Sequence, residues 1–551
     1  MGMKPTDEQL KPLELTKQLQ SLKILAYAGT GKTTTLKMIS ENLDSQHKRG
    51  LYCAFNKAIA EEAKSKLPRS VECRTFHSLA FSNLPRNLTN KVNGDHIFPS
   101  TLAKEYNLRE MRISMDDEWY YNQPMHIMKS LEKQINKENQ RKFSPSQQAQ
   151  MINDSVSTFC RTASKAIAPR HVTLPDWISK DKAIVADLQQ QFFPLIKRRW
   201  EQLINVNNNV RIGHDIYLKV WQLSDPQLNY DYILMDEAQD LDPLMASILL
   251  RQNHIAVFYV GDAQQQIYDW RGAVNAMKNL NLPEFRLTKS FRFGPQVAIT
   301  ASKVLNMLGE EIPLKGHDPI QSTVSFQELP CPPNAILCRT NKGAFDELIE
   351  AFKLNDGRSY AINANVDEIL SFLKGAKKMI NGGTTDHPIL SNFLRWEEVQ
   401  EYAELDPTNQ EVSGFVRIIN EFDDIDLLIQ VVEKSKGTAI EEADCVICTA
   451  HKSKGLEWDN VLISKDFKLG LIESADRAVS MAYVKNTFKK TDAFKDVMPA
   501  ITSAITELPE SELRLIYVAV TRAKKNLGIA SLKLLFSAFD NALAEFYGVA
   551  E

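Results

Sequence analysis

Two short segments, far apart in the chain, carry residues that together could hydrolyse a nucleoside triphosphate. The first reads ILAYAGTGKTTTL from Ile24 to Leu36, and the second reads YDYILMDEAQD from Tyr230 to Asp240. Each contains a short apolar run, typical of a buried strand, followed by polar residues. The first adds a glycine-rich loop with a lysine, and the second adds paired carboxylates. This combination predicts the two halves of a hydrolytic phosphate site.

The glycine-rich loop is suited to bind phosphate through its backbone. Gly29 and Gly31 can adopt the positive φ angles that turn successive N–H groups toward an anion. The helix expected from Lys32 directs its positive end at the same anion. Lys32 would place a cation at the β- and γ-phosphates, and the Thr33 hydroxyl would bind Mg²⁺. The residues expected to contact ATP here are Ala28, Gly29, Thr30, Gly31, Lys32, Thr33 and Thr34.

One position of this loop departs from the strict phosphate-loop pattern, which has glycine where the chain has Ala26. The alternative is an ordinary glycine-rich turn before a helix. The order of strand, loop and helix favours the phosphate loop.

The paired carboxylates follow the second apolar run. Side chains at the carboxyl end of a parallel strand project into the crevice where such sheets bind ligands. Asp236 is therefore placed to complete the Mg²⁺ shell, and Glu237 to orient or deprotonate the attacking water. A solvated Asp-Glu turn is the alternative, and the phosphate loop upstream disfavours it.

Composition narrows the class of protein. A chain of 551 residues predicts three or four domains, and 43% hydrophobic with 25% charged residues is typical of a soluble protein. No apolar run reaches membrane-spanning length, and the first residues lack the apolar core of a signal peptide. A net charge of −3 gives no overall basic field, so nucleic-acid binding would need a locally basic cleft.

Cysteine usage predicts a reducing compartment. Seven cysteines in this length do not describe a disulfide scaffold. Cys445 and Cys448 form a CxxC inside an apolar run, which favours a structural strand over zinc or redox chemistry. We expect a cytoplasmic protein, associated with the nucleoid in a bacterium or nuclear in a eukaryote.

Alternation of short strands and helices predicts two α/β domains with parallel, doubly wound sheets. The first domain is expected to span 1–84 and 212–284, and the second to span 285–362 and 440–551. The segments 85–211 and 363–439 lack the alternation and are expected to be helical insertions. Helices are expected at Lys32–Ser45 and Lys57–Leu67, and strands at Lys23–Tyr27, Leu51–Phe55, Val71–Arg74, Tyr232–Met235, Ile255–Val260, Phe285–Leu287, Ala335–Leu337, Cys445–Thr449, Val461–Ser464 and Leu527–Ala530.

Further motifs, in a fixed order, resemble those of UvrD/Rep-type superfamily 1A DNA helicases. After the two segments above come VGDAQQQIYDWRGA, LTKSFRFG, TAHKSKGLEWD and LIYVAVTRAKKNL, and AFNKAIAEEA and TFHSLA also fit. The resemblance is strongest to the helicase region of F-box DNA helicases, and the segments that carry it are AFNKAIAEEA, SFRFG and YVAVTRAKK. We expect no F-box segment here. The resemblance implies an α/β fold with two RecA-like parallel-sheet (P-loop) domains, each interrupted by a mainly helical insertion.

The resemblance also implies roles at the ATP site. Arg292 and Arg522 would bring positive charge to the γ-phosphate from the second domain, and Gln265 would contact the same phosphate. The implied adenine and ribose contacts are Phe291 stacking on the base, Gln9 reading its edge and Glu457 at the ribose.

A second set of implied contacts would grip single-stranded DNA. Tyr268 and Trp270 would stack on bases, which is the sequence-tolerant way to hold a single strand. The other implied contacts are Asn56, Thr75, His77, Arg271 and His451. The two histidines have no partners at zinc-ligand spacing, so a zinc site is not expected.

Three features depart from the family pattern. Tyr27 stands where members commonly have glycine, and it would crowd or stack near the nucleotide. Ala54 and Phe55 stand where members have an aromatic residue and threonine. The second insertion is shorter than in the large bacterial members.

Taken at face value, the resemblance implies an ATP- and Mg²⁺-dependent translocase that moves 3′ to 5′ on single-stranded DNA and unwinds duplex. Its partners would be single-stranded and tailed duplex DNA, with recombination or repair proteins as further candidates. Two alternatives stay open: a remodeller of DNA-bound proteins such as recombinase filaments, and an ATPase subunit of a nuclease or defence complex.

Overall fold

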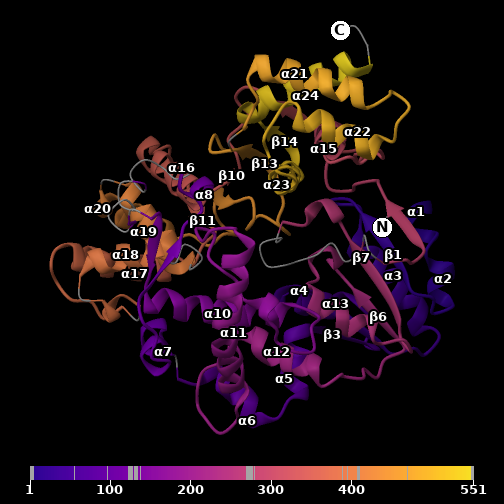
Figure 1. Ribbon diagram of the computed structural model, residues 1–551. Coiled ribbons are helices and arrows are strands. Elements are labelled where there is room, and N and C mark those ends of the chain that lie inside the picture. The colour runs from indigo at the N-terminus through magenta and orange to yellow at the C-terminus, as the bar shows by residue number, and fades with distance from the viewer. Residues whose placement is uncertain are drawn as a thin grey trace.

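Two six-stranded parallel sheets organise the chain (Figure 1). The computed structural model describes residues 5–54, 56–95, 97–121, 128, 135–136, 138–267, 277, 280–387, 389–393, 395–405, 410–422, 424–467 and 469–547. The fold class expected from the sequence, two RecA-like α/β domains with helical insertions, is confirmed. No helix in these described ranges is long and apolar enough to cross a membrane.

The first sheet gathers strands from both sides of a long insertion. Its order, from one edge to the other, is β3 (Val71–Thr75), β2 (Gly50–Ala54), β6 (Tyr232–Met235), β7 (Ala256–Gly261), β1 (Leu22–Ala26) and β8 (Glu284–Leu287). Strands β2, β6 and β7 are buried along their whole length, because helices cover both faces of a parallel sheet. The accompanying helices are α1 (Asp7–Leu10), α2 (Leu13–Lys17), α3 (Lys32–Asp44), α4 (Lys57–Lys66), α5 (Phe76–Asn83), α12 (His214–Leu223) and α13 (Pro243–Leu250).

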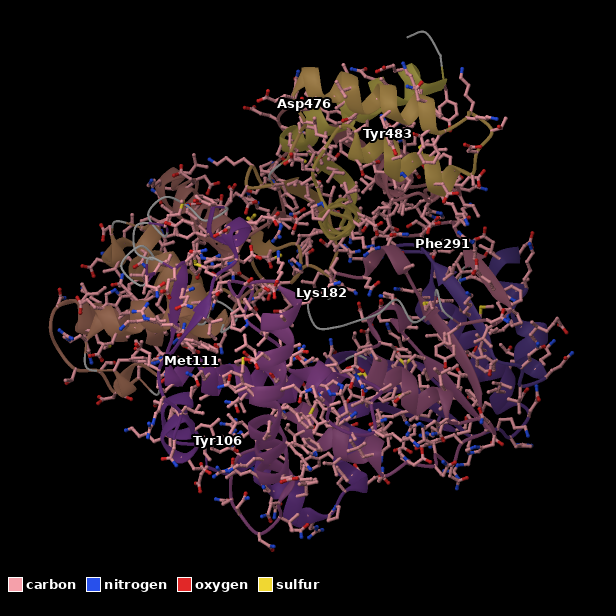
Figure 2. The ribbon with its side chains drawn as sticks, viewed as in Figure 1. Tyr106, Met111, Lys182, Phe291, Asp476 and Tyr483 are labelled. Carbon is pink, nitrogen blue, oxygen red and sulfur yellow. The ribbon has the colours of Figure 1, made fainter. Side chains whose placement is uncertain are left out.

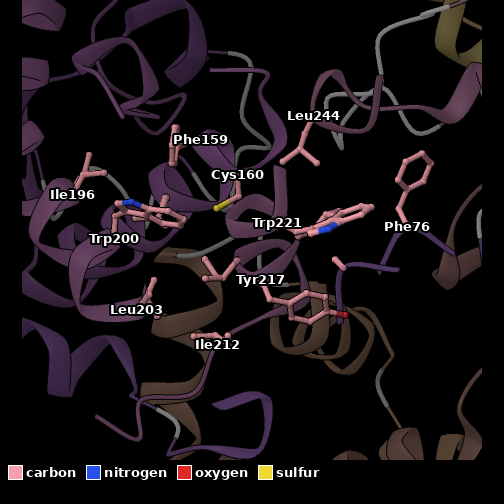
Figure 3. Packing of buried hydrophobic residues seen from close by; sticks show 14 of the residues in the cluster. Phe76, Phe159, Cys160, Ile196, Trp200, Leu203, Ile212, Tyr217, Trp221 and Leu244 are labelled. Carbon is pink, nitrogen blue, oxygen red and sulfur yellow. The ribbon is translucent and has the colours of Figure 1, made fainter. Parts of the chain in front are cut away.

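The first insertion is mainly helical and shares its core with the first sheet. Its helices are α6 (Arg86–Thr89), α7 (Pro99–Glu105), α8 (Asp117–Tyr121), α10 (Pro145–Arg161) and α11 (Lys182–Ile204). One hydrophobic cluster joins Phe159 and Trp200 of the insertion to Trp221 and Leu244 of the first domain (Figure 3). The insertion is therefore packed on the domain that carries the phosphate loop.

A small two-stranded antiparallel sheet in this insertion was not predicted from the sequence. β4 (Met111–Ser114) pairs antiparallel with β5 (Gln140–Phe143). In β5 the side chains of Arg141 and Phe143 are buried while Lys142 is exposed, which is the two-residue alternation of a strand. Four residues are too few for that alternation to stand out in a polar, helix-rich segment.

The second sheet has the order β11 (Tyr360–Ile362), β12 (Cys445–Thr449), β10 (Ala335–Cys338), β13 (Trp458–Ile463), β14 (Ala523–Gly528) and β9 (Thr323–Ser325). Around it lie α15 (Pro295–Met307), α16 (Asn341–Leu354), α21 (Ser474–Thr487), α22 (Phe494–Ser503), α23 (Glu510–Val520) and α24 (Lys533–Tyr547). Figure 1 shows α21, α22 and α24 together at the top, close to the C-terminus.

The second insertion consists of α17 (Val366–Ile380), α18 (Trp396–Leu405), α19 (Gln410–Glu421) and α20 (Ile425–Lys436). These helices form one hydrophobic cluster with α16 and with residues of β10 and β12. They cover one face of the second sheet, at the left of Figure 1.

Every strand expected from the sequence overlaps an observed strand. The largest shift is at the last one, expected at Leu527–Ala530 and found at Ala523–Gly528, because the polar run of Lys524 to Asn526 belongs to the strand. β9 and β11 were not expected, since three residues are too short to show a periodicity.

Candidate ATP and DNA site

The phosphate loop lies between β1 and α3 with its glycines in left-handed conformations. Gly29 has φ +72° and Gly31 has φ +84°, a region that other residues enter only at a cost. Gly31 caps α3, and having no side chain it leaves the first amides of that helix facing an incoming anion. The loop geometry thus has the features of an anion-binding nest.

Lys32 and Glu237 form an ion pair at the centre of the site. The Lys32 Nζ lies 2.8 Å from Glu237 Oε1. Burial favours the neutral carboxyl, but Lys32, and then Lys454, lower the pKa of Glu237 to about 2. Burial would lower the pKa of Lys32, yet the surrounding carboxylates, Glu237 first, raise it. Both groups are therefore charged at neutral pH.

Glu237 holds a backbone conformation that few residues adopt. Its φ of +50° and ψ of +42° lie in the left-handed region, which costs a non-glycine residue on the order of 1 kcal/mol or more. The turn directs the residue away from the line of β6, and Gln239 Nε2 donates to its Oε2. Strain of this kind is common where a side chain must be aimed into a site.

Asp236, at the end of β6, is held by donors on both carboxylate oxygens. The Tyr52 hydroxyl donates to Oδ2 at 2.6 Å, and the Glu237 amide donates to Oδ1 at 2.9 Å. Burial, and next the charge of Glu237, raise the pKa of Asp236. Tyr52 is a functional candidate that the sequence analysis missed, because nothing in the strand Gly50–Ala54 marks its hydroxyl as facing a carboxylate.

A hydrogen-bonded chain runs from the first domain to Arg522 of the second. Gln265 Nε2 donates to Asp262 Oδ2 at 2.8 Å, and Arg522 Nη2 donates to Gln265 Oε1 at 3.4 Å. Burial raises the pKa of Asp262 to about 6. Burial, with Arg292 nearby, lowers the pKa of Arg522 to about 9, which leaves the guanidinium charged at neutral pH. Asp262 was also missed, although it belongs to the VGDAQQQ motif.

Arg292 reaches the same region from the segment between β8 and α15. Its Nε lies 2.6 Å from Glu457 Oε2, and its Nη1 donates to the Thr521 carbonyl at 3.3 Å. Thr521 adjoins Arg522, so the two arginines expected at the γ-phosphate lie close together. Glu457, expected at the ribose, is paired here with Arg292.

The residues expected at the adenine meet over Gly31. A Cβ added to Gly31 would lie 2.9 Å from Gln9 Nε2 and 3.8 Å from the Phe291 ring. Gln9 also donates to Thr35 Oγ1 on α3, and the Phe291 amide donates to the Gly29 carbonyl. Figure 2 shows Phe291 at the junction between the first sheet and the upper helices of the second domain. A base beside this loop would thus find an aromatic ring and an amide on either side.

The residues expected to hold Mg²⁺ suit that ion. Thr33 is exposed beside the loop, and Asp236 is a buried carboxylate. In the described part of the chain, no three or more His, Cys, Asp or Glu side chains form a group that could hold a metal by themselves. One hydroxyl and one carboxylate, completed by phosphate oxygens and water, is a ligand set typical of Mg²⁺.

Tyr27 does not lie where the sequence analysis expected it. Its side chain is only 7% exposed and packs in a hydrophobic cluster with Phe293 and Val297 of the second domain. Its hydroxyl donates to the Ile312 carbonyl at 2.9 Å. The ring therefore faces the second domain and offers no surface on which a base could stack.

The expected DNA contacts of the first domain line the carboxyl edge of its sheet. Asn56 follows β2 and Thr75 ends β3, and both side chains cap the helices that follow. His77 lies in the first turn of α5, with its Nε2 3.8 Å from Asp215 Oδ1. His77 and Glu237 line the same small cavity, so a residue expected to contact DNA adjoins the carboxylate expected to orient water.

The second domain contributes His451 and Lys454, which follow β12. Burial, and next Arg339, lower the pKa of His451, so its ring is neutral at neutral pH. Lys454 bonds Asp240 and the Gln265 carbonyl of the first domain, a contact the sequence analysis did not foresee. The remaining expected DNA contacts, Tyr268, Trp270 and Arg271, lie outside the described residues, as does Phe55.

Two parallel sheets, with the glycine-rich loop and Lys32 on the first and Arg292 and Arg522 approaching from the second, define a two-domain P-loop fold. The UvrD/REP helicase N-terminal domain model matches residues 6–284, about half of the chain. The chain belongs to the UvrD/REP helicase family.

Individual relatives agree with this assignment. F-box DNA helicase 1 of Gallus gallus is 30% identical over 537 residues, covering 92% of this chain and 47% of the relative. F-box DNA helicase protein 1 of Schizosaccharomyces pombe is 27% identical over 584 residues, covering 98% of this chain and 58% of the relative. ATP-dependent DNA helicase PcrA of Leuconostoc citreum is 24% identical over 315 residues, covering 53% of this chain and 38% of the relative. The chain thus spans about half the length of the two F-box relatives.

Proposed function

We propose that the protein is an ATP-dependent translocase on single-stranded DNA and a DNA helicase that moves 3′ to 5′. The observation that carries the proposal is the hydrogen-bonded chain from Asp262 through Gln265 to Arg522, which crosses from one sheet domain to the other. Hydrolysis at such a site can change the contact between the domains. The direction of movement is proposed from membership in the family.

Each part of the site has a defined task in this proposal. The loop amides and Lys32 bind the phosphates, and Mg²⁺, held by Thr33 and Asp236, would neutralise the charge that develops on them. A triphosphate competes with Glu237 for the Lys32 ammonium, so binding frees that carboxylate to orient water. Arg292 and Arg522 supply positive charge from the second domain, as loose phosphoryl-transfer transition states require.

The DNA side supports coupling between strand binding and hydrolysis. His77 shares a cavity with Glu237, and Lys454 bonds the carbonyl of Gln265. A strand held by Asn56, Thr75, His77 and His451 would therefore lie close to the groups that act on the γ-phosphate. Stacking by Tyr268 and Trp270 would hold the bases, with Arg271 on the backbone.

The test is ATP hydrolysis with and without single-stranded DNA, together with unwinding of 3′- and 5′-tailed duplexes. Lys32→Ala is expected to lower hydrolysis at least about 100-fold and to abolish unwinding, because the phosphates lose their cation. Lys37→Ala is the matched control, since Lys37 is an exposed residue of the same helix and forms a surface ion pair with Glu41. Hydrolysis that is rapid and indifferent to DNA would overturn the motor function.

Two other outcomes would redirect the proposal. Displacement of a protein filament from DNA without unwinding would identify a remodeller. Hydrolysis that appears only with a partner protein would identify a subunit of a larger assembly. Recombination or repair proteins are the partners we would try first.

A further inference from the structure

One carboxylate of the second domain lies within hydrogen-bond distance of polar groups on three residues of the first sheet and its loops. Glu310 Oε2 lies 3.3 Å from the Tyr27 hydroxyl and 3.3 Å from Arg286 Nη1. Its Oε1 accepts from Gln264 Nε2 at 2.9 Å. The three donors come from the phosphate loop, the turn that carries Gln265, and strand β8.

The backbone fixes Glu310 at this junction. It follows α15, and its amide donates to the Leu305 carbonyl at 2.9 Å, closing the end of that helix. Gly309, with φ +82°, makes the turn that releases the chain from α15. Helix α15 packs against α23 and β14, so Glu310 is anchored in the body of the second domain.

Tyr27 reinforces the link through its ring and hydroxyl. The ring lies in one hydrophobic cluster with Phe293 and Val297, and the single hydroxyl proton is shared between the Ile312 carbonyl at 2.9 Å and Glu310 Oε2 at 3.3 Å. Next to it, the Ala28 amide donates to the Tyr517 hydroxyl at 3.1 Å, and that hydroxyl donates to Asp262 at 3.1 Å. Two successive residues of the phosphate loop are therefore bonded to the second domain.

Gln264 connects the same junction to Gln265, the residue expected to contact the γ-phosphate. Its amide nitrogen bonds Glu310, and its amide oxygen accepts from Arg514 Nε of α23 at 3.5 Å. Gln264 directly precedes Gln265, so a shift of this turn would displace both second-domain partners of Gln264, which are Glu310 and Arg514. Tyr27, Gln264 and Glu310 line one small cavity, together with Asp262 and Arg286.

We propose that Glu310 is a positioning residue that ties the phosphate loop and the Gln264–Gln265 turn to helix α15, so that rearrangement of the loop on nucleotide binding moves the second domain. The inference rests on the proposed function for its purpose, because a motor needs such a link. The link itself concerns nucleotide binding and domain position, which can be measured without DNA.

The experiment compares Glu310→Ala and Tyr27→Phe with the wild-type chain. Tyr27→Phe keeps the packed ring and removes only the hydroxyl. The matched control is Tyr230→Phe, which removes a tyrosine–carboxylate bond of 2.7 Å to Glu72 within the first domain. Thermal unfolding establishes that each variant is folded.

Two readouts follow. The first is the affinity for a fluorescent, non-hydrolysable ATP analogue. The second is energy transfer between dyes on cysteines at the exposed positions Ser45 and Asn486, one in each domain, with the half-buried Cys73 and Cys331 changed to Ser. We expect Glu310→Ala to weaken analogue binding roughly tenfold and Tyr27→Phe roughly threefold, with Tyr230→Phe unchanged.

The nucleotide-dependent change in energy transfer is expected to fall by more than about half in Glu310→Ala and to be retained in Tyr230→Phe. Glu310→Gln keeps one carbonyl acceptor and should give a smaller loss than Glu310→Ala. Wild-type affinity and a wild-type transfer change in Glu310→Ala and Tyr27→Phe would overturn the inference. A chain whose hydrolysis ignores DNA would overturn the proposed function while leaving both readouts interpretable.

Discussion

At the scale of single residues, the site is a buried set of opposite charges. Asp236 and Asp262 are buried and Glu237 is partly buried around Lys32, and Arg522 approaches from the second domain. Removing a carboxylate from water favours its neutral form, while a neighbouring cation favours the charged form. The outcome differs by residue: the pKa of Glu237 is lowered, and those of Asp236 and Asp262 are raised.

Asp262 gives a prediction for pH. Its pKa of about 6 in the folded chain is above the usual value, so its contribution to stability is present at low pH and is lost as pH rises through about 6. Between pH 5 and pH 7 the free energy of unfolding of the wild type should fall by about 1 kcal/mol relative to Asp262→Asn, which cannot titrate. Urea titrations of both proteins at several pH values measure this difference. Parallel pH dependence in the two proteins would contradict it.

At the scale of elements, the phosphate loop is shaped by its glycines and by what packs on it. A Cβ on Gly29 would lie 2.4 Å from Ser290 Oγ and 2.6 Å from Arg292 Cβ. Position 29 therefore requires glycine for two reasons: the positive φ angle of the loop and the close approach of the segment Ser290–Arg292. The same segment delivers the arginine expected at the γ-phosphate.

Gly29→Ala should destabilise the chain by about 3 kcal/mol, combining the cost of a positive φ with overpacking. Gly357→Ala is the matched control, since Gly357 has φ +79° but nothing within 4 Å of an added Cβ. It should cost only about 1 kcal/mol. Chemical denaturation gives both values, and equal losses in the two variants would show that the contact with Arg292 is unimportant. Nucleotide affinity should fall in Gly29→Ala alone.

At the scale of the whole molecule, the two sheet domains meet through buried polar contacts. The Lys454–Asp240 ion pair joins the segment after β12 to the turn after β6, with side-chain exposures of 11% and 1%. Burial raises the pKa of Asp240 to about 6, with Lys454 opposing that rise. The pair therefore contributes most to the stability of the fold above that pH, where Asp240 is charged.

Lys454→Met should destabilise the chain by about 3 kcal/mol at pH 8, because it leaves a charged carboxylate buried without its partner. The additional change Asp240→Asn should recover most of that loss. Lys525→Met serves as control, since the Lys525–Asp459 pair is largely exposed and should contribute less than about 1 kcal/mol. Thermal or urea unfolding provides the comparison. An equal effect of the two lysine substitutions would exclude a buried cross-domain role.

The sequence by itself determined the fold class and predicted the residues of the candidate ATP site. Apolar runs such as Tyr232–Met235 predict buried parallel strands, since only a strand covered on both faces is apolar throughout. Gly29, Gly31 and Lys32 predict a phosphate loop, because backbone angle and charge are properties of the residue type. Signals of this kind depend only on residues that are close together in the sequence, so they can be recognised without the structure.

Only the tertiary structure decided which of these residues touch. Tyr52 on β2 meets Asp236, which directly follows β6, and Glu310 meets Tyr27 across the domain junction, at sequence separations that no local pattern spans. From the sequence, Tyr27 was expected to crowd or stack near the nucleotide, yet its ring lies in a hydrophobic cluster with Phe293 and with Val297 of α15. Hydrogen bonds and buried charges depend on distances in space, which the chain acquires only when the two sheets are assembled.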